Sequence, residues 1–287
     1  MFFGKGLVST PEDFGIQGQL PSHPGLLDWL ACDFRDHGWD VKRLCRNIVF
    51  SSTYRQNSLP ANPKALELDP DNRLLSRGPR HRLSAEMLRD LALHAAKMIT
   101  EEGGGEPVHS YLPENLYPDS GIQEFYKQDH GAGLWKRFLY LYRKRTLPLP
   151  FLTTFDASTR EYCRVRREIT ATPLQALVLL NAPDFLEPCR VLAEKALASD
   201  KSEINLIIRR AFRSFTGRLP SAVEQKVLET LHAEQLAFYE KHPEEAALLV
   251  SKSGETPPNP ALPAPAVAAL TMVNRLILSD DDTVMKK

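Results

Sequence analysis

The sequence predicts a mostly α-helical protein: an irregular helical domain with a long, loop-rich central insertion. It also leaves a short strand pair open. Apolar residues recur at helical spacing in both outer parts of the chain, whereas the central part is rich in glycine and proline and has no such period. We therefore expect a single domain over residues 1–287, with N-terminal helices (1–100), an irregular insertion (101–171) and C-terminal helices (172–287) that include a Pro-rich linker (254–265).

Capping residues predict three helices in the N-terminal part. Ser22 is expected to cap the first helix, which Gly38 ends, and Asp40 is expected to cap the second. Ser84 is expected to start the third helix, with Leu83 and Leu88 placed to form a hydrophobic staple. The predicted buried stripe of that helix consists of Met87, Leu88, Leu91, Ala95 and Met98, with His94 among them.

One stretch of the central insertion has a pattern of its own, LWKRFLYLYRKR at residues 134–145. Phe138, Tyr140 and Tyr142 alternate with leucines, which predicts a strand; a helix is the alternative because the run is short. Its mixture of aromatic and basic residues is also suited to stacking on sugars or bases. We favour an amphipathic strand with one buried face, because the alternation alone accounts for the pattern.

The C-terminal helices are predicted from equally local signals. Thr172, Pro173 and Gln175 form the cap, the first-turn proline and the capping box of one helix. A second capping box runs from Ser221 to Glu224. Between these two starts, a helix that Gly217 ends is expected to bury Ile204, Ile207, Ile208, Ala211, Phe212 and Phe215.

Composition excludes several classes of protein. The chain has 36 basic and 36 acidic side chains, and this balance argues against a dedicated nucleic-acid binder. No apolar run is long enough to span a membrane. The four cysteines form no CxxC or CxxCH motif, and the eight histidines form no HxxxH or HExxH motif, so neither a metal site nor covalently bound haem is expected.

The strongest concentration of charge is basic. Residues 136–168 contain nine Lys or Arg against three Asp or Glu, and they include the run CRVRRE. The candidate cluster consists of Arg164, Arg166, Arg167, Asp156 and Cys163. It is either an anion-binding site, because guanidinium groups bind carboxylate, sulfate and phosphate well, or a structural ion-pair network that fastens the irregular segment to the helices. We favour the structural interpretation.

Two members of this cluster have further alternatives. Cys163 among cations could form a reactive thiolate, although no histidine lies near it in the sequence. Asp156 could act as a general acid or as an Asx-turn residue. Arg167 is expected to pair with Asp156, Glu86 or Asp90, and loss of such a pair would cost about 3 kcal/mol or more if the pair is well buried.

Three segments together carry a family resemblance: SHPGLLDWLACDFRDHGWDVKRLCRNIVFSSTYRQ, DPDNRLLSRGPRHRLSAEMLRD and FDASTREYCRVRREITATPLQALVLLNAP. They resemble the C-terminal domain of unknown function of planctomycete-type cytochrome c proteins, the domain that follows the cytochrome c module. The resemblance runs from about Phe3 to about Leu278. The positions that match the motifs of that family are His23, Pro24, Trp29, Tyr54, Arg55, Gln56, Arg82, Glu86, Arg89, Asp90, Asp156, Cys163, Arg166, Arg167, Thr172, Pro173 and Gln175.

The resemblance implies a non-catalytic scaffold or binding module associated with exported cytochrome c-type proteins, with a cytochrome c module or a surface complex as its partner. The alternative is an enzyme domain that acts on an anionic or sulfated polysaccharide. Because the chain has no CxxCH, we expect no cofactor in it and place haem in an upstream module. The family setting implies an exported or periplasmic location, but we expect no signal peptide here and a truncated start at FGKGLV, so the compartment stays open.

Overall fold

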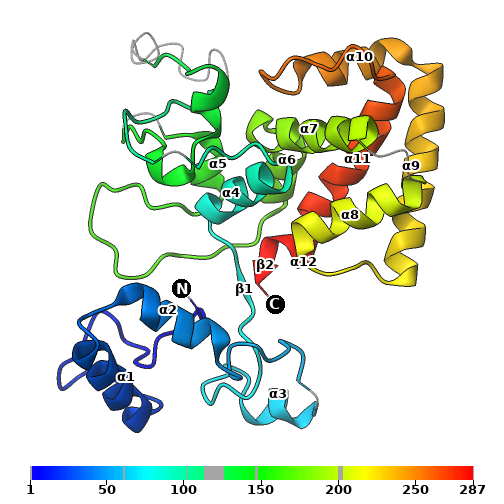
Figure 1. Cartoon of the computed structure of the whole chain (residues 1–287). Coiled ribbons are helices and arrows are strands. Elements are labelled where there is room, and N and C mark those ends of the chain that lie inside the picture. The colour runs from blue at the N-terminus through cyan, green and yellow to red at the C-terminus, as the bar shows by residue number, and fades with distance from the viewer. Residues whose placement is uncertain are drawn as a thin grey trace. The chain divides into compact units, whose positions relative to one another are not determined.

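The computed structural model describes residues 2–60, 62–101, 103–112, 126–145, 148–199 and 203–286 (Figure 1). The chain forms two compact units. Unit 1 consists of Met1–Arg82, Arg164–Arg166 and Met285–Lys287, and unit 2 consists of Leu83–Cys163 and Arg167–Val284. The single domain expected from the sequence stays a prediction, and the two units are described separately below.

Unit 1 contains three helices and a minimal sheet. They are α1 (Pro24–Asp36), α2 (Val41–Phe50), α3 (Lys64–Leu68), β1 (His81–Arg82) and β2 (Met285–Lys286), and the two strands are antiparallel. The cap of α1 is His23 and not Ser22 as predicted, because proline at the first helical position moves the start by one residue. Asp40 caps α2 as predicted, since its carboxylate accepts a hydrogen bond from the Arg43 amide at 3.0 Å.

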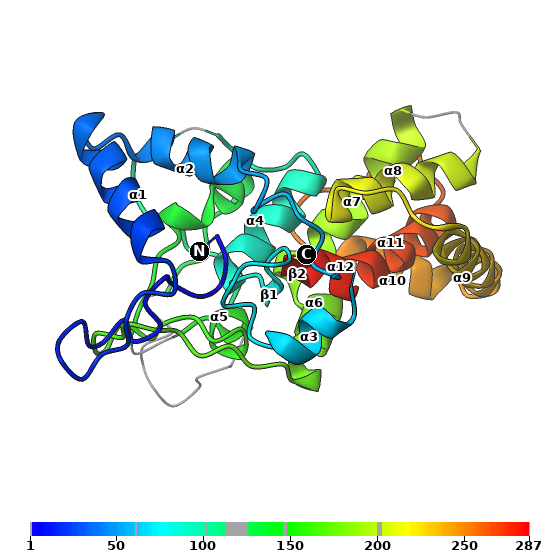
Figure 2. The ribbon, with the colours of Figure 1, turned by 90° about the horizontal axis from the view of Figure 1, so that it is seen from below.

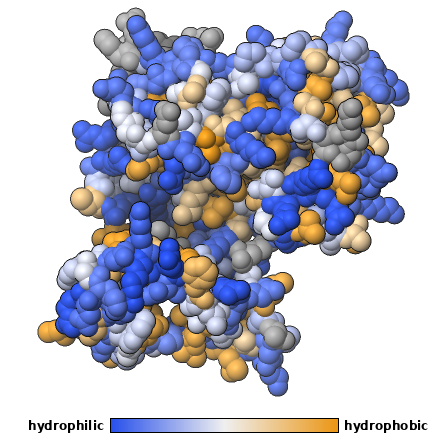
Figure 3. All heavy atoms as spheres, viewed as in Figure 1, coloured by the Kyte–Doolittle hydropathy of each residue, from blue (hydrophilic) through white to orange (hydrophobic). Residues whose placement is uncertain are grey.

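Polar and aromatic contacts hold unit 1 together. Neither α1 nor α2 contributes a buried residue, and hydrophobic residues are visible at the surface of this unit in Figure 3, in keeping with exposed side chains such as Trp39. The ring of Tyr54 contacts Phe2 and Phe3 edge-on, and the Lys286 ammonium lies 3.3 Å from its centroid. The last strand is therefore fastened to the N-terminal residues by a cation–π contact.

Unit 2 holds the large hydrophobic core. Its α-helices are α4 (Ala85–Ala95), α5 (Pro150–Thr154), α6 (Pro173–Asn181), α7 (Pro183–Ser199), α8 (Ile204–Thr216), α9 (Ala222–Lys241), α10 (Pro243–Lys252), α11 (Ala264–Ser279) and α12 (Asp281–Val284). Two 3₁₀ helices, η2 (Gly131–Trp135) and η3 (Phe138–Tyr140), lie in the central insertion. Helix α11 runs through the middle of the unit and packs against α6, α7, α8, α9 and α10 (Figures 1 and 2).

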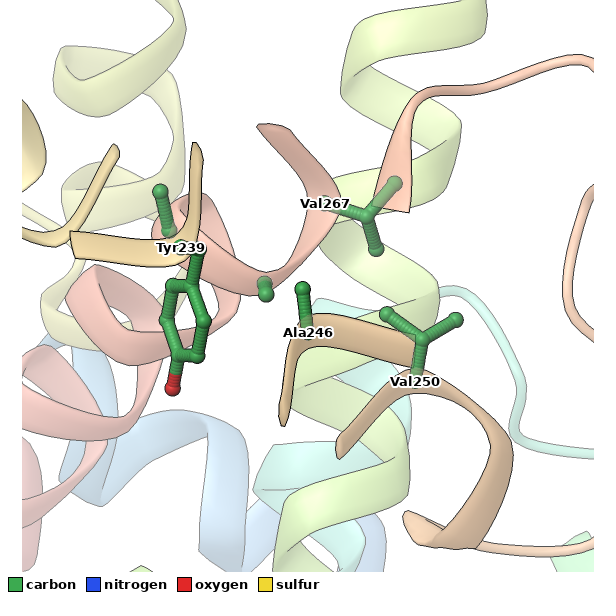
Figure 4. Packing of buried hydrophobic residues seen from close by; sticks show 6 residues of the cluster. Tyr239, Ala246, Val250 and Val267 are labelled. Carbon is green, nitrogen blue, oxygen red and sulfur yellow. The ribbon is translucent and has the colours of Figure 1, made fainter. Parts of the chain in front are cut away.

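The sequence of α11, APAVAALTMVNRLILS, explains its central place. Small and branched apolar residues occupy almost its whole circumference, which is the pattern of a helix buried on all sides. At one end, Val267, Ala268 and Ala269 pack against Tyr239 of α9 and against α10 residues Ala246 and Val250 (Figure 4). Small alanines at this contact let three helices approach closely.

The predicted fold class is confirmed. The described residues form twelve α-helices and one two-stranded antiparallel pair. Ser84 caps α4, Gly217 ends α8 with φ +78°, and the Ser221–Glu224 capping box starts α9, as predicted. Five of the six residues predicted to be buried in α8 are buried, namely Ile207, Ile208, Ala211, Phe212 and Phe215, whereas Ile204 is half-buried.

Two predictions for unit 2 were wrong. Residues 138–140 form a 3₁₀ helix and not a strand, because the Phe138 amide donates to Asp90 of α4 and so leaves the ladder pattern. In α4, Met87 and His94 are exposed, while Arg89 is buried. The core therefore contacts a face of α4 that includes a charged residue, which apolar periodicity cannot reveal. Part of the predicted insertion, residues 102, 113–125 and 146–147, lies outside the described residues.

Candidate functional site

The five residues of the predicted charged cluster fall in different parts of the fold. Arg164 and Arg166 belong to unit 1, whereas Asp156, Cys163 and Arg167 belong to unit 2. All three arginines and Cys163 are exposed. Within unit 2, the structure joins Arg167 to another residue that the motif match singled out, Glu86.

Glu86 is the centre of a three-residue ion-pair group, the Glu86 cluster, which also contains Arg143 and Arg167. Arg167 Nη1 donates to both carboxylate oxygens of Glu86 at 2.9 Å, and Arg143 Nη2 donates to Oε1 at 3.0 Å. Burial alone would raise the pKa of Glu86. Hydrogen bonds from its own amide and from Ser84, together with the charge of Arg167, lower that pKa below its usual value.

The two arginines of the Glu86 cluster differ in burial. The side chain of Arg143 is 11% exposed, and that of Arg167 is 48% exposed. Arg143 also donates to the Ser158 carbonyl at 3.2 Å and lies 4.8 Å from the centroid of the Phe138 ring. Burial lowers the pKa of the Arg143 guanidinium. Arg143 is therefore the interior member of the cluster, and Arg167 closes it from the solvent side.

Asp156 is engaged in the start of α6. Its backbone has a left-handed φ of +57°, and its Oδ2 accepts hydrogen bonds from the amide and hydroxyl of Thr170 at 2.7 and 2.8 Å. Gln175 Nε2 donates to the same hydroxyl at 3.1 Å, and Gln175 Oε1 accepts from the Thr172 amide. The Asp156 carboxylate thus fastens the segment before α6 through a residue fourteen positions further along the chain, and its two predicted roles, general acid and Asx turn, stay predictions.

Two further motif residues on α4 hold the central insertion. Arg89 is 2% exposed and donates to the carbonyl oxygens of Leu134 and Lys136. Asp90 accepts from the Phe138 amide at 2.8 Å, and burial raises the pKa of its carboxyl. Together with the isolated β-bridge between Thr100 and Lys136, these side chains of α4 satisfy backbone groups of residues 134–138.

Helix α7 carries a second polar face that the sequence analysis missed. It consists of four buried ionisable residues, here named the α7 ladder: Asp184, Glu187, Arg190 and Glu194. Ser110 donates to Asp184 at 2.7 Å, and Arg89 Nε lies 3.6 Å from the same oxygen. Burial raises the pKa of Asp184. This first rung joins α7, α4 and the segment around Ser110.

The second residue of the ladder, Glu187, accepts hydrogen bonds from three segments. One carboxylate oxygen accepts from the Tyr111 hydroxyl at 2.7 Å and from the Trp135 indole at 3.4 Å. The other accepts from the amide and hydroxyl of Thr256 at 2.7 and 2.6 Å. Glu187 is 1% exposed, and four donors compensate its burial.

The remaining rungs hold the Pro-rich linker. Arg190 donates to Ser253 Oγ at 2.5 Å and to Glu194 at 2.6 Å, and Glu194 also accepts from the Asn259 amide at 3.4 Å. The segment predicted as a linker is therefore fastened along α7. The spacing of the four residues on one helix face, 184, 187, 190 and 194, was the available signal, but only the fold shows that this face is buried.

The motif residues of unit 1 make separate contacts. His23 caps α1 and its ring lies 3.0 Å from Ser22 Oγ, and Trp29 is 56% exposed. The amide of Arg55 donates to the Ser51 carbonyl at 3.2 Å, and Arg82 lies in β1 opposite Met285. Tyr54 carries the cation–π contact already described.

No metal or membrane site stands out in the part of the chain that the structure describes. Within those ranges, no group of three or more His, Cys, Asp or Glu side chains could hold a metal ion. Nor does any described helix have the length and apolar character needed to cross a membrane. What the charged groups of unit 2 do is hold irregular backbone against helices.

The unequal burial of the two arginines predicts unequal costs. Arg143→Ala should reduce the free energy of unfolding by about 2–3 kcal/mol, less than for an isolated buried pair because Arg167 still neutralises Glu86. Arg167→Ala should reduce the free energy of unfolding by about 1 kcal/mol or less, because Arg167 is half exposed. The loss of about 3 kcal/mol expected from the sequence holds only for a well-buried pair. Urea unfolding of the two variants measures both values. Equal costs, or a larger cost for Arg167→Ala, would contradict the assignment of Arg143 as the interior member.

Gly254 packs closely against Glu187 of the α7 ladder, so a substitution at Gly254 tests how tightly the ladder is packed. A Cβ atom at Gly254 would lie 2.5 Å from Glu187 Cβ. Gly254→Ala should therefore displace Glu187 from its donors and cost about 1–3 kcal/mol. Gly133→Ala is the matched control, since its Cβ would meet only Asp129 Cβ, at 3.9 Å. Thermal melts of both variants check this, and unchanged stability of Gly254→Ala would show that the ladder is not closely packed there.

Comparison with known protein families identifies the family to which the chain belongs. Residues 1–232, from unit 1 into α9, match the family described as PSD1, protein of unknown function (DUF1553). No curated protein and no solved structure matches the chain. Since the family match spans most of the sequence, including the motif positions in both units, the chain belongs to the DUF1553 family of proteins of unknown function.

Proposed function

We propose that this chain is a non-catalytic scaffold or binding module that works beside exported c-type cytochrome proteins. Membership of a family of unknown function is compatible with this role, and the resemblance to domains that follow a cytochrome c module gives the partner. In this proposal haem belongs to the partner module, this chain supplies no cofactor, and both act outside the cytoplasm. Nucleic acid is not a ligand, in keeping with the balanced charge of the chain.

The observation that carries the proposal is the way in which the charged groups of unit 2 are used. The carboxylates of Glu86, Asp156 and Glu187 each accept at least two hydrogen bonds from side chains or amides that position the backbone. Catalytic carboxylates need an open side that faces substrate. These carboxylates are hydrogen-bonded to groups of the protein itself. This favours a structural role, as the rigid support of a binding surface, over a catalytic one.

A second candidate is an enzyme domain that acts on an anionic or sulfated polysaccharide. The exposure of Arg164 and Arg166 favours it, because exposed guanidinium groups attract sulfate and carboxylate. This candidate also needs a carboxylic acid and a histidine near the arginines. Asp156 is engaged with Thr170, and Arg167 with Glu86, so the second candidate has less support than the first.

One pair of measurements separates the two candidates. Isothermal titration with the cytochrome c module of a longer family member should show saturable binding, whereas an unrelated c-type cytochrome of similar charge should not bind. Incubation with dextran sulfate should release no reducing ends. Absence of binding to the module, together with a release of reducing ends that Asp156→Asn abolishes, would overturn the proposal in favour of the enzyme.

A further inference from the structure

Helix α9 has an outer face that no other described helix covers. Both ribbon views place α9 at the outer edge of unit 2, with α8, α10 and α11 against its inner side (Figures 1 and 2). Its inner side is anchored by the buried residues Leu228 and Tyr239. The exposed positions follow helical spacing over the whole length of α9: Ala222, Val223, Lys226, Val227, Thr230, Ala233, Glu234, Ala237, Phe238, Glu240 and Lys241.

This outer face is apolar and hollowed along one side. Val223 is 74% exposed, Val227 55% and Phe238 40%. A groove of about 650 Å³ runs between the first half of α9 and Leu276 of α11. Exposed apolar residues that are contiguous on a helix, as opposed to scattered singly, mark an interaction surface. Two charges, Lys226 and Glu234, lie among the residues that line this groove, and Glu240 and Lys241 add two more at the C-terminal end of the helix.

The arrangement of these residues is complementary to itself. Thr230 lies midway between Lys226 and Glu234, four residues from each. With a rise of about 1.5 Å per residue, the two charges sit about 6 Å on either side of Thr230. If a second α9 lies antiparallel across a two-fold axis through Thr230, each Lys226 meets the other Glu234. We propose that α9 is the contact by which two copies of this chain associate, antiparallel and centred on Thr230.

Side-chain sizes obey the same symmetry. Positions equally far from Thr230 come to the same height along such a pair. Seven residues from Thr230, close to the seam, Val223 faces Ala237, a large residue against a small one, whereas Val227, Ala233, Phe238 and Ala222 lie at the flanks of the contact. Offsets of three, four, seven and eight residues lie on one helix face, and large against small is the condition for close interdigitation. A symmetric pair thus satisfies apolar and charged positions together.

The self-complementary pattern is the reason to choose a second copy as the partner. In a two-fold dimer the same patch serves both subunits, so every favourable contact occurs twice. A partner with an unrelated helix has no reason to match a pattern that is symmetric about Thr230. Pairing of one 20-residue helix on each side lies at the small end of stable interfaces, which bury about 1,200–2,000 Å², so we expect a dimer that dissociates on dilution.

Charge exchange tests the pairing. Sedimentation velocity of the full chain over a wide concentration series should show a monomer–dimer equilibrium. Lys226→Glu and Glu234→Lys, made separately, should each raise the dissociation constant more than about tenfold, because each creates two like-charge contacts per dimer. The double variant Lys226→Glu/Glu234→Lys should regain the wild-type constant. An equimolar mixture of the two single variants should also associate, since each charge then meets its opposite.

The control and the contrary outcomes are equally specific. Leu248→Asp on α10 replaces another exposed apolar residue, 59% exposed, and should leave the equilibrium unchanged, and circular dichroism checks that every variant keeps its helix content. A wild-type chain that stays monomeric over the series would overturn the proposal. Single variants that dimerise as well as the wild type, or a mixture that fails to associate, would overturn the antiparallel arrangement about Thr230.

Discussion

The guanidinium group of Arg89 joins helix α4 to the carbonyl oxygens of Leu134 and Lys136 and lies 3.6 Å from Asp184 on α7. This contact holds the irregular backbone of the central insertion against the helices of unit 2. In the described residues of the central insertion, β-pairing is limited to isolated bridges such as Val108 with Leu141, so many of their amides and carbonyls need partners elsewhere. Side chains of two helices supply them, with Arg89 and Asp90 on one and the α7 ladder on the other.

Charged groups suit this task because irregular backbone offers single donors and acceptors at uneven spacing. A guanidinium group donates in several directions, and a carboxylate accepts on both oxygens. Burying them unpaired would cost several kcal/mol each, and the structure meets that cost by pairing. Glu187, for example, receives donors from Tyr111, Trp135 and Thr256, which lie in three separate segments. Removal of one partner therefore disturbs several segments together.

The sequence predicted the elements better than the contacts between them. Caps and apolar periods were sufficient for α2, α4, α6, α8 and α9, because those signals lie within a few residues of each other. Glu86 was among the expected partners of Arg167. The sequence did not indicate that Arg143 is buried and pairs with the same carboxylate. The α7 ladder was missed altogether. A polar face on a helix indicates solvent unless the fold covers it, and Ser110, Thr256 and Asn259, which cover this one, lie more than sixty residues away.

Hydrogen exchange of the variant Arg89→Met tests most directly whether buried charges position the central insertion. Methionine keeps the apolar stem of the side chain but removes the donors to Leu134 and Lys136. The account predicts faster exchange of the amides of Val108, Phe138 and Tyr142, which are hydrogen-bonded in the wild type, while the amides of α11 keep their protection. Unchanged exchange at those three amides would contradict the account. So would an equal loss of protection throughout α11, because Arg89 would then support the whole core and not the insertion.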